Sequence, residues 1–303
     1  MTAVFARIED SVYSYGGDDA TNPFPEASAE MVADFQRHGF VILRELFTAA
    51  DVERVRAAVA STDWLWSRQF GLADHEGRVY AQSQWLDPGH DLLGAAARNA
   101  KLAGIAEQLL DRGEIYMYSA KLLVKAPGSG GALQWHQDYG FWYNNGAIYP
   151  DFCVALMPLT DSDSENGGLA VIKGSKQCGR VDHVKRFGQL MADPERVELI
   201  SRRLPKVEVE LKAGDAVLFH ANTLHSSGQN RSARSRWHLI FSYNARLNDV
   251  AAAHYNASYR PLAKLPATAI RDCHTDRIEP RETLDPSDNP NIEAVDLSNA
   301  PAS

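Results

Sequence analysis

The stretch that decides the fold is LKAGDAVLFHANTLHSSGQNRSARSRWHLIFSY, residues 211–243. It contains two short runs rich in apolar and β-branched residues, 216–220 and 236–243, and Gly214-Asp215 marks a turn before the first. Runs of this length bounded by turn residues are typical of β-strands. The stretch therefore predicts two strands separated by a polar segment that carries His225.

Runs of the same character continue outward from this stretch, separated by glycine- and asparagine-rich turns. Helical periodicity is concentrated near the start of the chain, at 28–37, after the capping-box-like pair Thr48 and Asp51, and at 91–110. Many short strands with tight turns predict a sandwich or a closed barrel, so the fold class is mostly β with outer helices. The other expected strands are 40–44, 78–85, 115–125, 152–159, 169–172 and 207–211.

Composition and charge limit the classes of partner. The 303 residues are 45% hydrophobic and 23% charged, which is typical of a globular chain with a full core. The formal net charge of −8 argues against general binding to nucleic acid or to acidic membranes, and no apolar run is long enough to span a bilayer. The three cysteines and the polar N-terminus, which lacks a secretion signal, indicate a cytoplasmic protein.

The clearest chemical motif is Trp135-His136-Gln137-Asp138. In an extended segment residues i and i+2 face the same side, so His136 and Asp138 converge on one point. His225, just past an expected strand, is the candidate third ligand. Two histidines and one carboxylate make the facial triad of non-heme iron(II) oxygenases, which leaves positions open for a cosubstrate and dioxygen. An isolated H-x-D pair is common by chance, so the joint pattern carries the assignment.

Arg236 lies eleven residues after His225, at the start of an expected strand. A guanidinium in that place can hold a carboxylate bidentately, as the distal carboxylate of 2-oxoglutarate requires, and the Ser227 hydroxyl can bind the same group. Lys121, which alternates with Leu123, is a further candidate for contact with the cosubstrate. The alternative for Arg236 is a surface charge on an edge strand.

Four segments resemble the phytanoyl-CoA dioxygenase family, which includes ectoine hydroxylase. They are DFQRHGFVILRELF (34–47), VKAPGSGGALQWHQD (124–138), DSDSENGGLAVIKGSKQ (161–177) and the stretch 211–243. The resemblance implies a double-stranded β-helix, a jelly-roll or cupin-like barrel. It implies that His136, Asp138 and His225 hold Fe(II), that Arg236 and Ser227 hold 2-oxoglutarate, and that Gln137 neighbours the metal.

On this basis we expect a single oxygenase domain over residues 1–303. A mixed helical part, 1–112, would pack on a β-helix core, 113–245, and an extension, 246–303, would end in a loosely ordered tail from about Arg271.

A loop rich in aromatic residues follows the proposed ligands and predicts a wall of the substrate pocket. Trp142 and Tyr143 are the expected substrate contacts there, while Tyr80, Gln82 and Gln84 share one face of an expected strand and are candidates to line the same cavity. Arg180 and Arg186, in the basic loop 179–186, are candidates for a lid that recognises an anionic substrate. Core packing for the aromatics and a solvated surface for the arginines are the competing interpretations.

The expected reaction is hydroxylation of a small, possibly acidic metabolite with dioxygen, releasing succinate and CO2. With the same cofactors the product could instead arise by desaturation, cyclisation or endoperoxide formation. A metal-binding barrel without turnover and a hydrolytic zinc enzyme are the remaining alternatives. The sequence assigns neither the substrate nor the oligomeric state.

Overall fold

The computed structural model describes residues 5, 8, 10–16, 19–249, 258–288, 293–295 and 297. Its strands form a large sheet, a small sheet and a hairpin. The large sheet has the order β1 (Val12–Ser14), β2 (Phe40–Arg44), β12 (Ala216–His220), β7 (Phe152–Pro158), β14 (Arg236–Ala245), β5 (Ile115–Lys125), β4 (Val79–Trp85) and β3 (Phe70–Ala73). The small sheet is β11 (Lys206–Val209), β8 (Leu169–Ile172), β13 (His225–Ser227) and β6 (Leu133–His136), and the hairpin is β9 (His183–Arg186) with β10 (Gln189–Ala192).

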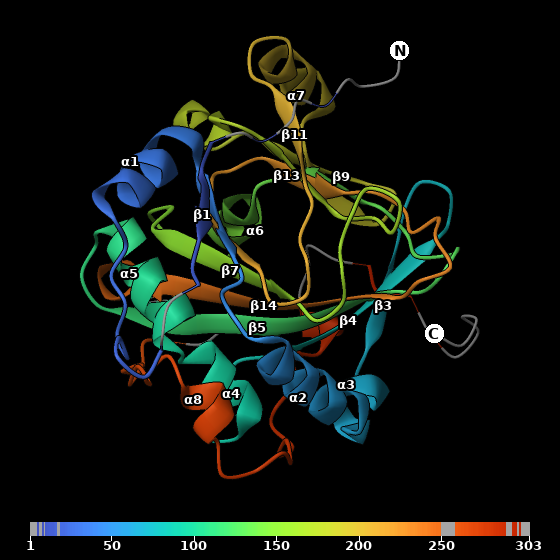
Figure 1. The fold of residues 1–303 in the computed structure, drawn as a ribbon. Coiled ribbons are helices and arrows are strands. Elements are labelled where there is room, and N and C mark those ends of the chain that lie inside the picture. Colours follow the sequence, from blue (N-terminus) through green and yellow to red (C-terminus); the bar gives the residue numbers. More distant parts are fainter. Residues whose placement is uncertain are drawn as a thin grey trace.

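The two main sheets face each other and form a barrel of the expected jelly-roll type (Figure 1). All pairs among these strands are antiparallel apart from the parallel pair β1–β2. Helix α6 (Asp138–Asn144) lies between the sheets, where Figure 1 shows it in the centre of the view. The expected strands of the core are confirmed, and each has its counterpart within a few residues.

Helices cover the outer face of the large sheet (Figure 1). They are α1 (Ala29–His38), α2 (Ala49–Ala60), α3 (Asp63–Ser67), α4 (Leu92–Ala97), the π-helical turn η1 (Ala100–Gly104), α5 (Ile105–Leu110) and α8 (Ala269–Asp272), while α7 (Pro194–Ser201) leads into β11. The capping box expected at Thr48 and Asp51 is present at the start of α2. None of the helices in the described part of the chain is long and apolar enough to cross a bilayer.

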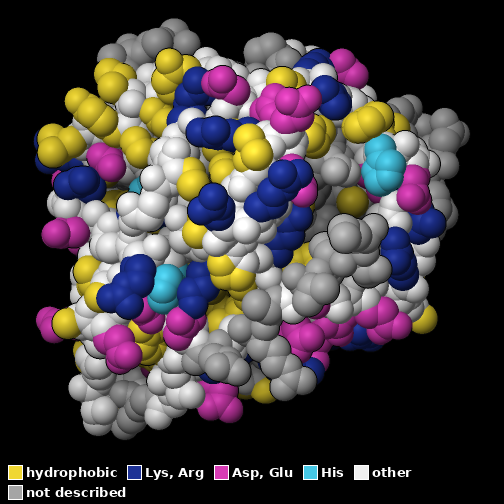
Figure 2. All heavy atoms as spheres, turned by 90° about the horizontal axis from the view of Figure 1, so that it is seen from above, with side chains coloured by type: hydrophobic (Ala, Val, Ile, Leu, Met, Phe, Trp, Pro, Cys, Tyr) yellow, Lys and Arg dark blue, Asp and Glu magenta, His cyan; other side chains and the backbone are white. Residues whose placement is uncertain are grey.

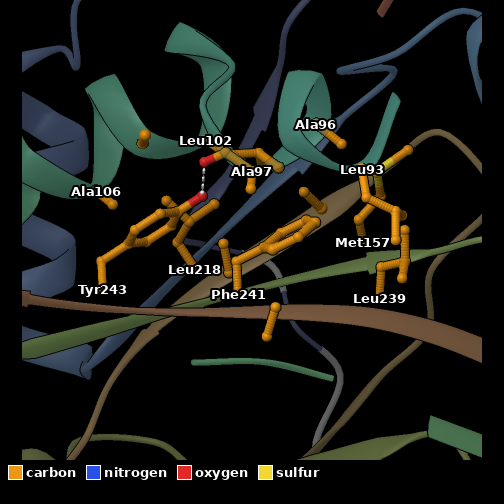
Figure 3. Packing of buried hydrophobic residues seen from close by; sticks show 14 of the residues in the cluster. Leu93, Ala96, Ala97, Leu102, Ala106, Met157, Leu218, Leu239, Phe241 and Tyr243 are labelled. Atoms are coloured by element: carbon orange, nitrogen blue, oxygen red, sulfur yellow. Dashed lines mark hydrogen bonds between the residues drawn. The ribbon is translucent and has the colours of Figure 1, made fainter. Parts of the chain in front are cut away.

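Strand β14 separates the core from the interior of the barrel because successive side chains point to opposite faces. Figure 3 shows Leu239, Phe241 and Tyr243 pointing outward to the helices, and all three are fully buried there. The Tyr243 hydroxyl donates a hydrogen bond of 2.7 Å to the carbonyl oxygen of Ala97. The alternate residues, Arg236 and His238 among them, face the barrel interior.

The expected helix over 91–110 is interrupted at Asn99. Its side-chain oxygen accepts from the Lys101 amide at 2.9 Å and its amide nitrogen donates to the Ala267 carbonyl at 3.0 Å. These bonds compete with the helical pattern, so the segment divides into α4, η1 and α5.

The tail is anchored further along the chain than its composition suggests. Arg281 pairs with Asp91, both almost fully buried, and the Leu284 amide donates to the Gln84 carbonyl at 2.8 Å. The expectation of a loosely ordered tail from about Arg271 is therefore wrong for this part, because buried pairing outweighs its polar composition. Residues 289–292, 296 and 298–303 lie outside the described part.

Charged side chains of both signs occupy the face seen from above in Figure 2. The positive charge of Arg236, in contrast, is enclosed inside the barrel.

Candidate active site

Three side chains converge at the mouth of the barrel. His136 ends β6, Asp138 begins α6, and His225 begins β13, directly opposite His136 in the strand register. One ligand atom from each lies within 4.8 Å of the others, and His225 Nε2 is 3.8 Å from Asp138 Oδ2. The three residues expected to bind the metal therefore meet around one point.

Each of the two imidazoles forms a hydrogen bond through Nδ1, which leaves Nε2 available to a metal. His136 Nδ1 lies 2.8 Å from the Gln134 carbonyl oxygen, and His225 Nδ1 lies 3.0 Å from that of Thr223. A carbonyl only accepts, so each Nδ1 carries the proton and each Nε2 keeps its lone pair for a metal. Burial, with the charge of His225, lowers the pKa of His136 well below its usual value, which favours the neutral form that binds metal. This donor set fits iron(II).

Gln137 points away from this point. It is fully buried, its Nε2 donates to the carbonyls of Gly179 at 2.8 Å and Asn222 at 2.7 Å, and its Oε1 accepts from the Val181 amide at 2.7 Å. The alternation that directs His136 and Asp138 inward directs Gln137 outward. Gln137 therefore neighbours the three ligands in the chain, as expected, but its side chain supports them from behind and does not face the site of a cofactor.

His183 of the β9–β10 hairpin completes this support. Its Nε2 accepts from the Gln137 amide at 3.0 Å, and its Nδ1 donates to the Val181 carbonyl at 2.8 Å. The ring lies against Gly140 so closely that a Cβ there would be 2.2 Å from His183 Cε1. The sequence analysis treated this segment as a loop and did not identify His183. No local pattern predicts its contact with Gly140, because the two residues are far apart in the sequence.

Arg236 is a buried cation without a counter-ion in the described residues. The side chain is 1% exposed, its Nη1 donates to the Gly167 carbonyl, and Nε and Nη2 have no hydrogen-bond partner. Burial lowers the pKa of Arg236 to about 9, with Tyr80 opposing the shift. Such unpaired donors are costly in a protein interior, so this arginine fits an anionic ligand.

Lys125 and Ser227 lie beside Arg236 and add hydrogen-bond donors to the same anion site. Lys125 lies opposite Arg236 in the β5–β14 register, and its Nζ donates to Ser227 Oγ at 2.8 Å and to the Gly228 carbonyl. The Ser227 oxygen accepts this bond, so its own proton remains available to an acceptor in the cavity. The sequence analysis named Lys121 and not Lys125. Both lysines lie on one face of β5, and only the strand register shows that Lys125 is the one opposite Arg236.

A cavity runs from the three ligands to Arg236. Its walls include Trp142, Tyr80, Gln82 and Gln84, which were expected at the substrate pocket, and Lys121, which was expected near the cosubstrate. His238 lines it as well; this residue is 1% exposed and its Nε2 has no partner among the described residues. The sequence around His238 matches no metal-binding or catalytic motif. It lies two residues beyond Arg236 on β14, however, and so faces the same interior.

Three expected substrate contacts lie outside this cavity. Tyr143 is 48% exposed, and the Arg180 guanidinium stacks on its ring at 4.3 Å while pairing with Asp182 at 2.7 Å. Arg186 is exposed at the end of β9. Trp142 and Tyr143 are adjacent on α6, so their side chains diverge and only Trp142 faces the cavity.

Comparison with known proteins identifies relatives over most of the chain. A family model described as phytanoyl-CoA dioxygenase matches residues 35–237. The L-proline trans-4-hydroxylase of Streptomyces griseoviridis is 30% identical over 72% of this chain and 86% of its own length. The ectoine dioxygenase of Bordetella parapertussis is 26% identical over 86% of this chain and 87% of its own.

Solved structures share the fold. EctD from S. alaskensis in its apoform is 23% identical, with a TM-score of 0.65 over 85% of this chain and 92% of that chain. The same protein with bound Fe gives an equal TM-score. These similarities confirm the barrel expected from the sequence.

Proposed function

The chain belongs to the phytanoyl-CoA dioxygenase family, and from this membership we propose that it is an iron(II)- and 2-oxoglutarate-dependent dioxygenase that hydroxylates a small organic molecule. One observation carries the proposal: a His-Asp-His cluster and a buried arginine without a counter-ion in the described residues lie in one cavity. A structural metal site alone would have no use for that arginine.

Iron(II), 2-oxoglutarate and dioxygen supply the oxidising chemistry, with succinate and CO2 as by-products. The side chains of the protein hold and orient these molecules. Arg236 and Ser227 are set to bind the distal carboxylate of 2-oxoglutarate, and Lys125 orients the serine. Trp142 and Phe141 form an apolar wall that limits the access of water to the reacting centre.

Small, polar substrates are supported by the relatives, which are named for hydroxylation of L-proline and oxidation of ectoine. We propose a substrate of similar size, bound on the Trp142 and Gln82 side of the cavity. Tyr80, an expected substrate contact, instead lies beside Lys125, whose Nζ is 5.9 Å from the Tyr80 ring centroid. The roles of individual residues and the domain boundaries at 112 and 245 are part of this proposal. The three free cysteines support a reducing compartment such as the cytoplasm.

Anaerobic titration of the protein with iron(II) and 2-oxoglutarate tests the assignment. We expect the visible charge-transfer absorption of an iron(II)–keto acid complex, and its loss in His136→Ala. Its absence from the unmodified protein would overturn the proposal. Succinate release excludes a barrel that only binds metal, and product mass separates hydroxylation, which adds one oxygen, from desaturation, which removes two hydrogens.

A further inference from the structure

Lys121 is a second cation in the cavity, separate from the Arg236 site. It lies opposite Ile240 on β14 and opposite Gln84 on β4, whereas Arg236 lies opposite Lys125. Lys125 lies four positions after Lys121, which corresponds to about 13 Å along a strand. Lys121 is therefore too far along the barrel to share a carboxylate with Arg236.

The charges of the cavity leave Lys121 without an anion. Asp138 is the single acidic side chain among the described residues that line it, and Lys121 interacts electrostatically with Asp138 and His136. A metal ion bound by Asp138 would engage that carboxylate, and the distal carboxylate of a bound cosubstrate would engage Arg236. In the part of the chain that the structure describes, no other acid lines the cavity to replace Asp138 as a partner of the Lys121 ammonium.

The surroundings of Lys121 suit an anion with an apolar body. Gln84 is directly opposite in the strand register, where side chains approach within about 5 Å, so its amide can donate beside the ammonium. Gln82 lines the cavity from the same strand face, and Ile240, Leu156 and Trp142 provide apolar surface nearby. An ammonium and an amide donor side by side match the two oxygens of a carboxylate.

We propose that Lys121, with Gln84, binds a carboxylate of the substrate, so that the enzyme acts on small organic acids or amino acids. This inference rests on the proposed function, because it assumes that Arg236 is occupied by 2-oxoglutarate. It assigns Lys121 to the substrate, in place of the cosubstrate role expected from its spacing in the sequence.

The first test separates the two lysines by their effect on the cosubstrate. Binding of 2-oxoglutarate is measured anaerobically with iron(II) in Lys121→Met, Lys125→Met and the surface control Lys212→Met. We expect Lys121→Met and Lys212→Met to stay within about twofold of the unmodified protein, and Lys125→Met to weaken binding at least about tenfold. If Lys121→Met weakens 2-oxoglutarate binding as strongly as Lys125→Met, Lys121 belongs to the cosubstrate and the inference is wrong.

The second test uses matched acids and amides, with L-proline and L-prolinamide as one pair in a panel of small carboxylic acids. Binding to the iron(II)–2-oxoglutarate complex is followed anaerobically by tryptophan fluorescence, and turnover by succinate above the substrate-free background. We expect acids to bind at least about tenfold more tightly than their amides. Lys121→Met should remove this preference, and Lys121→Arg should restore part of it.

Two results would contradict the inference: equal binding of acids and amides, or no binding by any acid in the panel. In either case an intact charge-transfer absorption and substrate-free succinate formation show that the proposed function itself still holds. Loss of those two signals in the unmodified protein would instead remove the proposed function and this inference together.

Discussion

Arg236 shows how a single residue can be placed for function at a cost in stability. The guanidinium is buried, only one of its nitrogens is bonded to the described part of the protein, and burial lowers its pKa. Removing an uncompensated charge from a protein interior generally stabilises the fold. The ligand-free protein therefore retains a group that becomes favourable only when an anion binds.

Arg236→Met is expected to change stability and binding in opposite directions. The ligand-free variant should be more stable by about 1–3 kcal/mol, because an apolar side chain of similar length replaces a buried charge. Its affinity for 2-oxoglutarate should fall at least about thirtyfold. Urea unfolding and anaerobic titration measure the two effects.

Arg234→Met is the matched control, since Arg234 is half exposed and pairs with Asp163 and Glu165 at the surface. It should leave both quantities almost unchanged. A less stable Arg236→Met protein with unchanged cosubstrate affinity would show that Arg236 is only structural.

At the scale of elements, the metal site depends on the fit between α6 and the β9–β10 hairpin. Gln137 is bonded to three backbone groups behind the ligands, and His183 fills the space that Gly140 leaves open. Groups that orient metal ligands commonly contribute a factor of about 10 to 100 in affinity. The hairpin therefore belongs functionally to the metal centre although it supplies no ligand.

Gly140→Ala should lower iron(II) affinity by about tenfold, because its Cβ would lie 2.2 Å from the His183 ring and force it off the Gln137 amide. The same change in a His183→Ala background should have a much smaller effect, since the ring is gone. Anaerobic competition with a chromogenic chelator gives both affinities. Additive effects in the double variant would refute the contact as the cause.

Gly104→Ala serves as the control for helix propensity. A Cβ at Gly104 meets only the Ala100 Cβ, at an ordinary 3.6 Å. Alanine there should leave iron binding unchanged and leave stability equal or slightly higher.

At the scale of the whole molecule, buried histidines make the metal-free fold sensitive to acid. Burial lowers the pKa of His220 to about 3, with Lys176 and Arg112 adding to the shift, and lowers those of His136 and His238 well below the usual value. Between about pH 6.5 and 3 the unfolded chain binds a proton at His220 that the folded chain does not, and His136 and His238 act in the same direction. Their contribution to stability is therefore complete above about pH 6.5 and decreases as pH falls.

Metal-free protein should unfold at lower urea concentration at about pH 5.0 than at about pH 7.5. Each such histidine contributes about 1.4 kcal/mol per pH unit below about 6.5. His220→Asn, whose side-chain oxygen can replace Nδ1 as acceptor for the Asn222 amide, should make the dependence less steep by that amount. An unchanged slope in the variant would mean that His220 titrates normally in the folded state.

Local pattern alone was enough to predict most strands and the capping box of α2. Two-residue periodicity places His136 and Asp138 on one face, and it gives Arg236 and His238 a common face on β14. The fold class and the three proposed metal ligands followed from these features together with the family resemblance. Only the pair His136 and Asp138 is close in sequence, so the backbone alone sets its geometry.

Only the tertiary structure decided which distant residues meet. Strand register places Lys125, and not Lys121, opposite Arg236, and it places His225 opposite His136. The turn into α6 leaves Trp142 in the cavity and Tyr143 outside, and hairpin packing takes Arg180 and Arg186 away from it. Periodicity fixes the face on which a side chain lies, but register between strands is set by long-range packing that no local pattern contains.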